Sequence, residues 1–407
     1  MSLNSTPKAN RLHIGIFGRR NAGKSSLINA LTGQDLAIVS DTPGTTADPV
    51  YKSMELHPVG PVVFIDTAGI DDEGDLGQLR VAKTEDVIAR TDIAILVADV
   101  DTPDFEFEKI WLDRLDKAGV PVITVLNKTD ESAGENVPGS FTSAIRVSAK
   151  TGEGIDQLRE AITNAVPEEY MQEMILGDIL EDGSLVLLVM PQDIQAPKGR
   201  LILPQVQTLR ELLDRKCHVM STTADGLTDA LASLNRAPDL IITDSQCFNE
   251  VYQKKPEQSA LTSFSILMAA SKGDIDVFVE GASAIDEALS NLEAAVDTSS
   301  ASFKVLIAEA CTHVPLNEDI GTVKIPRLLQ KQFGDRVEIT SVRGNDFPDA
   351  EGLKNFDLII HCGACMFNRR HVMSRIAAAR EAGVPITNYG IFLAKMAGIL
   401  DKVSLPT

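Results

Sequence analysis

The residues from Gly18 to Ser25 have the types and the spacing of a phosphate-binding loop. Their sequence, GRRNAGKS, fits the pattern G-x-x-x-x-G-K-[ST] and lies between a strand-like and a helix-like stretch. Glycines let the backbone curl so that N–H groups point at phosphate oxygens, and a helix N-terminus adds favourable potential for an anion. Lys24 then reaches the β- and γ-phosphates, and Ser25 binds Mg²⁺. The residues expected to contact the nucleotide here are Asn21, Ala22, Gly23, Lys24, Ser25 and Ser26.

Three further motifs follow apolar strands, in the order expected of a guanine-nucleotide site. In the first, DTAG, the Asp66 carboxylate holds Mg²⁺ through water and the Gly69 N–H senses the γ-phosphate. In the second, NKTD, Asp130 accepts the N1–H and the exocyclic amine of guanine, a donor pair that adenine lacks. In the third, SAK, a backbone N–H meets the guanine O6. The predicted base-binding residues are Asn127, Lys128, Asp130, Ser148, Ala149 and Lys150.

Two cysteine–histidine clusters mark a second candidate site. Cys311-Thr-His313 follows one predicted strand, and His361-Cys362-Gly-Ala-Cys365 follows another. Open α/β sheets bind ligands beyond the carboxyl ends of their parallel strands, so these side chains are expected to converge. Ligand types alone leave the metal open, because three cysteines with a histidine suit structural zinc, and three thiolates also hold a [4Fe–4S] cluster with one iron open. The other two cysteines, Cys217 and Cys247, have no neighbouring ligands and are interpreted as small packing residues.

The elements that position these motifs indicate three consecutive α/β domains. Residues 1–170 form a predicted P-loop GTPase fold, and residues 171–272 and 273–407 form two smaller, mainly parallel-sheet domains. The strands predicted are Arg11–Phe17, Pro61–Asp66, Asp92–Val97, Pro121–Leu126, Ile145–Ser148, Ser184–Met190, Cys217–Ser221, Asp239–Thr243, Asp276–Glu280, Phe303–Ala308, Arg336–Thr340 and Asp357–His361. The helices predicted are Gly23–Leu31, Gly154–Val166, Pro204–Lys216, Ala284–Val296, Ile325–Phe333 and Arg370–Ala382.

Composition narrows the class of protein. The chain has 407 residues, of which 44% are hydrophobic, enough to bury several cores. Its formal net charge of −20 argues against nucleic acid and against an anionic membrane as partners. The polar start, residues 1–10, shows no signal peptide, and the apolar runs are shorter than a membrane span. Five cysteines do not make a disulfide framework. A cytoplasmic protein is therefore expected.

The loop and the segment after it resemble the TrmE–Era–EngA branch of translation-factor-like GTPases. The resemblance rests on GRRNAGKSSLINAL from Gly18 and PGTTAD from Pro43. It implies that Thr46 senses Mg²⁺, so that the predicted catalytic residues are Lys24, Thr46, Asp66 and Gly69. Ile70 follows DTAG and has no amide to orient the attacking water. The resemblance further implies a potassium ion, held partly by Asn21, in place of an arginine finger.

The cysteine–histidine pattern resembles that of the HydF family of [FeFe]-hydrogenase maturation GTPases. It consists of Cys311-x-His313, 47 intervening residues, and His361-Cys362-x-x-Cys365. The resemblance implies a [4Fe–4S] cluster on the three cysteines, with His313 and His361 as candidate fourth ligands. It also implies a homodimer, which we assign to the middle domain. The family's task would be to receive a precursor of the di-iron subcluster, assembled with the radical-SAM partners HydE and HydG, and to deliver it to apo-hydrogenase.

Two alternatives stay open from the residues themselves. One is a ribosome- or tRNA-associated GTPase like those of the Era and TrmE branch, with a metal or redox-sensing C-terminal site. It predicts a basic C-terminal domain, which the acidic balance of this chain does not favour. The other is an iron–sulfur or zinc redox sensor that gates GTP hydrolysis. Metal content separates these hypotheses.

Overall fold

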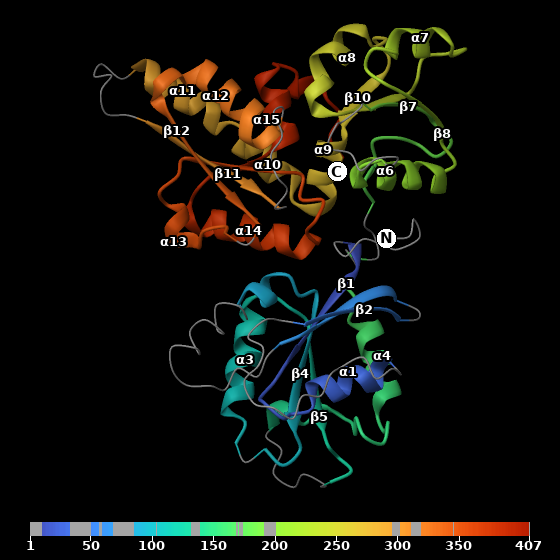
Figure 1. The fold of residues 1–407 in the computed structure, drawn as a ribbon, viewed down its shortest axis with the longest axis vertical. Helices are drawn as coiled ribbons and strands as arrows, with labels where there is room; N and C mark the ends of the chain where they lie inside the picture. Colours follow the sequence, from blue (N-terminus) through green and yellow to red (C-terminus); the bar gives the residue numbers. More distant parts are fainter. Residues whose placement is uncertain are drawn as a thin grey trace. The chain divides into compact units, whose positions relative to one another are not determined.

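The computed structural model describes residues 10–32, 50–56, 59–67, 85–102, 104–131, 139–167, 170, 174–190, 201–294, 302–310, 319–344 and 346–406. The chain divides into two compact units, Met1–Gln172 and Glu173–Thr407 (Figure 1). Each unit is described by itself. Among the described helices, none combines the length and the apolar character needed to cross a bilayer.

The first unit contains a six-stranded sheet in the order β2-β3-β1-β4-β5-β6. Every neighbouring pair is parallel except β2 and β3, which are antiparallel. The strands are β1 (Leu12–Phe17), β2 (Val50–Leu56), β3 (Gly60–Asp66), β4 (Ile93–Asp99), β5 (Val122–Asn127) and β6 (Ile145–Arg146). The edge strand β2 was not predicted, because its polar, half-exposed sequence VYKSMEL carries no buried apolar run.

Helices cover both faces of this sheet (Figure 1). The helices are α1 (Lys24–Thr32), α3 (Glu106–Lys117) and α4 (Ile155–Asn164). Apolar side chains of α1 and α4 share one core with inward residues of β1, while Trp111 and Leu115 of α3 pack on the opposite face. Burial of the strands on both faces explains their nearly continuous apolar sequences. This doubly wound arrangement is the P-loop GTPase fold that the sequence predicts.

The second unit contains two four-stranded parallel sheets. The first has the order β10-β9-β7-β8, and the second has the order β12-β11-β13-β14. The strands of the first are β7 (Leu185–Val189), β8 (His218–Thr222), β9 (Leu240–Thr243) and β10 (Ala260–Ser263). Those of the second are β11 (Phe303–Glu309), β12 (Val337–Arg343), β13 (Leu358–His361) and β14 (Ile386–Asn388).

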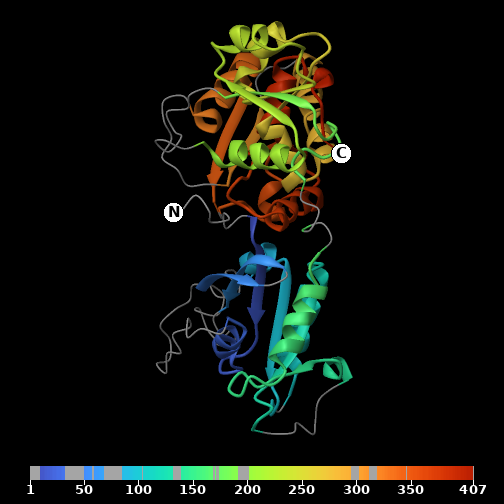
Figure 2. The same cartoon turned by 90° about the vertical axis from the view of Figure 1, so that its right-hand side faces the viewer.

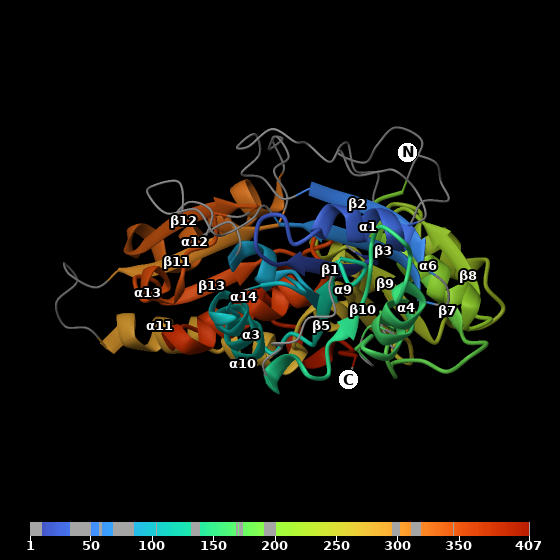
Figure 3. The ribbon, with the colours of Figure 1, turned by 90° about the horizontal axis from the view of Figure 1, so that it is seen from below.

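Helix α9 (Phe264–Lys272) joins the two sheets of this unit (Figures 1 and 3). It packs against α6 (Leu203–Asp214) on one side and against α14 (Arg369–Ala382) and α15 (Tyr389–Met396) on the other. One hydrophobic core runs through both sheets. The remaining described helices are α7 (Leu227–Ala232), α8 (Phe248–Lys254), α10 (Ile275–Gly281), α11 (Ala284–Ala294), α12 (Ile325–Phe333) and α13 (Ala350–Leu353).

One predicted strand, Asp276–Glu280, is wrong, because these residues lie in helix α10. The run DVFVE is a short stretch of β-branched and aromatic residues, which is typical of a strand. The Asp274 side chain instead caps a helix by accepting the Val277 N–H at 3.2 Å. Gly281 then lets the helix approach β14, since a Cβ there would lie 2.0 Å from the Ile386 carbonyl oxygen. Capping and tertiary contact outweigh the local β-propensity.

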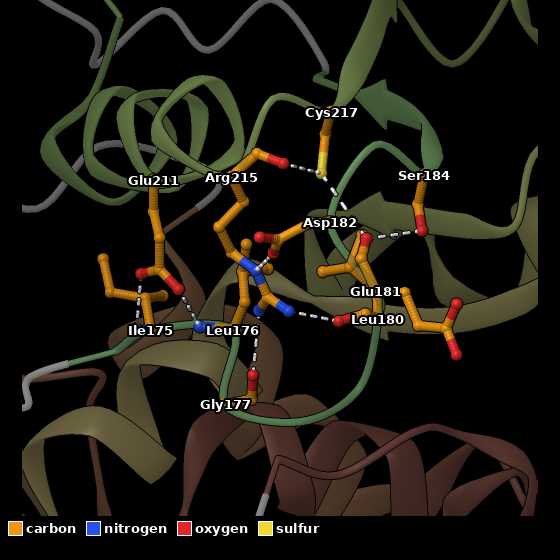
Figure 4. Close-up of polar contacts among 10 residues, drawn as sticks. All are labelled: Ile175, Leu176, Gly177, Leu180, Glu181, Asp182, Ser184, Glu211, Arg215 and Cys217. Atoms are coloured by element: carbon orange, nitrogen blue, oxygen red, sulfur yellow. Dashed lines mark hydrogen bonds and ion pairs between the residues drawn. The ribbon is translucent and has the colours of Figure 1, made fainter.

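Two side chains at the end of α6 hold the segment that enters the first sheet of the second unit (Figure 4). The Arg215 guanidinium bonds the Gly177 carbonyl at 2.9 Å and the Asp182 carboxylate at 3.0 Å. Glu211 accepts the backbone N–H groups of Ile175 and Leu176 at 2.6 and 3.1 Å. The Cys217 thiol is buried beside this network, which agrees with its interpretation as a packing residue.

Candidate functional site

The loop between β1 and α1 has the conformation of a phosphate cradle. Gly18 and Gly23 both have positive φ, +147° and +89°. A Cβ on Gly18 would lie 2.3 Å from the Val97 carbonyl oxygen, and one on Gly23 would lie 2.2 Å from the Asn127 side-chain nitrogen. Both positions therefore require glycine. The Lys24 ammonium lies back over the loop and donates to the carbonyl oxygens of Gly18 and Arg19, at 2.7 and 2.8 Å.

Two predicted magnesium-binding groups meet at the end of this loop. The Ser25 hydroxyl donates to the Asp66 carboxylate at 2.7 Å. Ser25 lies in the first turn of α1, and Asp66 ends β3, which pairs with β1 in parallel. A hydroxyl and a carboxylate oxygen are the hard ligands that Mg²⁺ takes beside nucleotide phosphates. The structure therefore brings together two residues that lie 41 positions apart in the chain.

The predicted base-binding residues also converge. The Asn127 amide donates to the Ala22 carbonyl at 3.0 Å and accepts the Ala149 N–H at 3.1 Å, so it bridges the phosphate loop and the SAK loop. Ser148 donates to Asp130 at 2.7 Å, and Lys150 lies 3.6 Å from the same carboxylate. The Ser148 hydrogen bond lowers the pKa of Asp130, with the Lys150 charge adding to the effect. Asp130 is thus held as an ionised acceptor.

Sequence reasoning missed Arg19 as a link between the phosphate loop and α3. Its guanidinium pairs with Glu108 at 2.9 Å and with Asp104 at 2.7 Å, and it lies 5.4 Å over the Phe107 ring. The Glu108 side chain is fully buried, and burial raises its pKa against the opposing effect of Arg19. Nothing in the local sequence distinguishes Arg19, since its partners lie 85 and 89 residues away.

The second site lies at the ends of two neighbouring parallel strands. Strands β11 and β13 pair in register with Ala308 opposite His361. Just beyond them, the Cys362 sulfur accepts backbone N–H groups from Ala310 at 3.1 Å and from Ala364 at 3.4 Å. Hydrogen bonds of this kind stabilise a thiolate. They fix the first cysteine of the Cys-x-x-Cys turn against the residue that precedes Cys311.

The turn itself is shaped for two sulfurs. Ala364 has φ +51°, which bends the chain between Cys362 and Cys365. Both cysteines are half-buried and neither forms a disulfide. Burial raises the pKa of the Cys365 thiol. A protonated, partly enclosed thiol such as that of Cys365 is the form that metal binding converts to a thiolate.

His361 lies inside the fold rather than beside the sulfurs. Its Nδ1 is 2.8 Å from the Cys362 carbonyl oxygen and its Nε2 is 2.9 Å from the Arg375 guanidinium. The Arg375 side chain lies 4.6 Å from both the Phe347 and the Phe367 ring. Burial, with the Arg375 charge second, lowers the pKa of His361 to about 3. The ring is therefore neutral, with Nδ1 donating to the carbonyl and Nε2 accepting from arginine.

Four predicted site residues lie outside the described residues: Thr46, Gly69, Cys311 and His313. Within the described part of the chain, no three acidic, cysteine or histidine side chains form a group that holds a metal ion. Of the three cysteines predicted to bind the cluster, only Cys362 and Cys365 lie in the described part of the chain. The donor set still suits iron–sulfur chemistry, because two sulfurs share one turn and one of them receives two N–H bonds.

Family models match three segments of the chain. Residues 175–273 match the hydrogen maturase F dimerization domain, and residues 286–406 match the hydrogen maturase F tetramerization domain. Together these two matches cover more than half of the chain. The chain belongs to the hydrogen maturase F family. Residues 13–128 match a family described as 50S ribosome-binding GTPase, so this hydrogen maturase F chain carries an N-terminal GTPase domain. The tetramerization description goes beyond the dimer that the sequence predicts.

Two curated relatives that are GTPases each match less than two fifths of the chain. GTPase Der of Nautilia profundicola is 39% identical over 165 residues, covering 37% of this chain and 36% of the relative. The tRNA modification GTPase MnmE of Legionella pneumophila strain Corby is 38% identical over 157 residues, covering 38% and 34%. The chain thus spans about a third of the length of these relatives. Among solved structures, an Aquifex aeolicus Era variant bound to GDP and AlF4⁻ is 18% identical with a TM-score of 0.34, covering 52% of this chain and 92% of that one.

Proposed function

We propose that this protein is a GTPase and an iron–sulfur scaffold that receives the di-iron subcluster precursor and delivers it to apo [FeFe]-hydrogenase. The observation that carries the proposal is the pair of hydrogen maturase F domains, the second of which contains the Cys362–Cys365 turn. HydE and HydG are the proposed donors of the precursor. The GTPase domain supports the first activity, and the N–H bonds to Cys362 support the second.

Cys311, Cys362 and Cys365 are the proposed ligands of a [4Fe–4S] cluster. Three thiolates leave one iron for an exchangeable ligand, and this open iron is where the cargo would bind. The bonds from His361 to the Cys362 carbonyl and to Arg375 use both of its ring nitrogens. We therefore expect His361 to brace the turn in this conformation, which leaves His313 as the histidine for the fourth position.

The proposed GTP hydrolysis depends on Mg²⁺. Ser25 binds the ion directly and Asp66 binds it through water, as their 2.7 Å contact supports. Thr46 and the Gly69 N–H are the proposed sensors of Mg²⁺ and of the γ-phosphate. Lys24 neutralises charge on the β- and γ-phosphates. Hydrolysis would change the loops that carry Thr46 and Gly69 and so modulate partner exchange.

Potassium is the proposed substitute for an arginine finger, with the Asn21 side-chain oxygen as one ligand. Wild-type protein is expected to hydrolyse GTP at least about tenfold faster in K⁺ than in Na⁺ at equal ionic strength, a barrier difference of about 1.4 kcal/mol. Asn21→Ala should turn over at the same slow rate in both salts. Asn21→Asp is the matched control, because it keeps an oxygen and tolerates the positive φ of +62°. Equal K⁺ stimulation of all three proteins contradicts the assignment.

The middle domain is the proposed homodimer interface. On α6, Val206 and Leu213 are 47% and 58% exposed and lie seven residues apart, hence on one face of the helix. Strand β8 is an edge strand of the sheet β10-β9-β7-β8, so its outer side is also available for pairing with a second chain. Replacing both side chains with glutamate should weaken the dimer by about 100-fold or more, as expected for the loss of two buried apolar side chains. Sedimentation velocity measures this. Ile110→Glu, at an exposed apolar residue of the GTPase domain, should leave the dimer intact.

Anaerobic purification tests the scaffold proposal. The protein should be brown, contain about four irons and four inorganic sulfides per chain, and lack stoichiometric zinc. An EPR signal of a reduced [4Fe–4S] centre should change when apo-hydrogenase removes the cargo. One zinc per chain without iron contradicts the proposal and favours a structural metal site. If the protein binds iron but transfers nothing to apo-hydrogenase, the carrier role is contradicted and the iron–sulfur site is not.

A further inference from the structure

The second residue of the phosphate loop, Arg19, holds the Lys24 ammonium through its backbone. Lys24 donates to the Arg19 carbonyl oxygen at 2.8 Å and to the Gly18 carbonyl oxygen at 2.7 Å, and only 8% of the lysine is exposed. The Ala22 N–H donates to the same Arg19 oxygen at 3.3 Å. This loop joins the dark blue strand β1 to the dark blue helix α1 (Figure 2). The direction of the Arg19 carbonyl therefore helps to decide where the Lys24 charge lies.

The Arg19 side chain attaches the loop to the start of helix α3. Its Nε donates to the Glu108 carboxylate at 2.9 Å, and a terminal nitrogen donates to the Asp104 carboxylate at 2.7 Å and to the Asp104 carbonyl oxygen at 3.2 Å. The guanidinium carbon lies 5.4 Å from the centre of the Phe107 ring. A guanidinium is a rigid planar fork, so contacts to two of its nitrogens and to its face fix its orientation. The fixed side chain in turn restricts the Arg19 backbone.

The two carboxylates that bind Arg19 differ in how far water reaches them. The Asp104 side chain is 58% exposed, whereas the Glu108 side chain is fully buried. Solvent and salt screen an exposed ion pair strongly, and they screen a buried one much less. The contact with Glu108 is therefore the one that anchors Arg19.

The packing of α3 would favour an apolar residue at position 108. Glu108 lies on the same face of the helix as Trp111 and Leu115, which are both buried. Burying a carboxylate is costly, and an apolar side chain of similar volume would pack there without that cost. In the part of the chain that the structure describes, the second carboxylate oxygen of Glu108 has no hydrogen-bond partner. The contact with Arg19 is thus what Glu108 provides that an apolar residue does not.

We propose that Glu108 is a positioning residue for GTP hydrolysis, which acts through Arg19 on the loop carbonyl that holds Lys24. The inference rests on the proposed contact of Lys24 with the β- and γ-phosphates. An ammonium group stabilises charge that develops in the transition state only where it is held in place beforehand. Glu108 acts on the reaction through this chain of contacts and takes no part in the chemistry itself.

Glu108→Leu removes the anchor at similar side-chain volume. Its kcat for GTP should fall about tenfold while its KM changes less than about threefold, because the misplaced ammonium costs more in the transition state than in the ground state. Glu108→Gln keeps an acceptor for Arg19 without the charge and should lose only about threefold in kcat. Asp113→Asn removes an exposed carboxylate of α3 that pairs with Lys117, and this matched control should turn over like wild type. Steady-state turnover by the full-length proteins, well below their melting temperatures, measures these effects.

A double-mutant cycle tests whether Glu108 acts through Arg19. If it does, the variant that carries both Glu108→Leu and Arg19→Leu should lose no more kcat than Glu108→Leu alone, because the contact is already broken. Losses that add up in the double variant contradict the inference. A purely structural role of Glu108 would lower the melting temperature and leave kcat at wild-type level, which also contradicts it.

The outcomes separate this inference from the proposed function. If Lys24→Ala hydrolyses GTP like wild type, the proposed role of Lys24 is itself wrong. If Lys24→Ala is inactive and Glu108→Leu turns over like wild type, the inference is overturned and the proposed role of Lys24 stands. If Glu108→Leu does not fold, as thermal melting would show, Glu108→Gln decides, since wild-type kcat in that variant contradicts the inference.

Discussion

Replacing Cys362 with serine is expected to abolish iron binding and to leave GTP turnover within about twofold of wild type. The Cys362 sulfur is the best-positioned ligand of the proposed cluster, since it accepts N–H groups from Ala310 and Ala364. A serine hydroxyl is a hard oxygen donor that does not ionise at neutral pH, so it replaces a thiolate poorly at an iron–sulfur centre. Two remaining cysteines hold such a cluster weakly. Iron content should fall from about four per chain to nearly none.

The GTPase activity is expected to survive because the two sites lie in different compact units. Cys247→Ser is the matched control, because Cys247 is half-buried in the same unit and burial raises the pKa of its thiol to about 11. That variant should keep its iron. Iron and sulfide analysis, with GTP turnover on the same samples, measures both properties. A Cys362→Ser protein that keeps four irons contradicts the ligand assignment, and one that loses GTP turnover contradicts the separation of the sites.

The sequence predicts the position of a site residue most accurately where a motif follows a buried strand. The apolar runs before DTAG, NKTD and HCGAC end at Asp66, Asn127 and His361, so the strand ends and the motifs coincide. Parallel pairing then brings these ends to one edge of each sheet. The convergence of these loops follows from local patterns, because the strands that precede the motifs are largely buried.

Long-range contacts explain what the sequence does not predict. The local sequence of α10 favours a strand. The residues form a helix because Asp274 caps it and because it packs against β14. His361 has the spacing of a metal ligand, but its ring bonds Arg375, fourteen residues away, rather than pointing at the sulfurs. Side-chain direction is set by tertiary packing, and spacing alone does not encode it.

Replacing Asp130 with asparagine is expected to exchange guanine for xanthine as the preferred base. The Asp130 carboxylate is held by Ser148 at 2.7 Å and by Lys150 at 3.6 Å, and the Ser148 hydrogen bond keeps its pKa low. It is therefore a pure acceptor for the N1–H and the exocyclic amine of guanine. Asparagine puts an N–H donor opposite one of these donors. Two charge-assisted hydrogen bonds, each worth about 1.5–3 kcal/mol, are lost or weakened.

At about 1.4 kcal/mol for each factor of ten, the affinity for GTP should fall by about 10²- to 10⁴-fold. Xanthosine triphosphate carries a carbonyl oxygen where guanine carries the amine, so it accepts a hydrogen bond from the new amide and should bind the variant better than GTP. Titration of a fluorescent analogue of each nucleotide measures both constants. Asp156→Asn, at an exposed carboxylate on α4 that pairs with Arg159, should bind GTP like wild type. If the Asp130 variant binds GTP as tightly as wild type, Asp130 does not recognise guanine. If the variant loses affinity equally for both nucleotides, Asp130 stabilises the loop and does not bind the base.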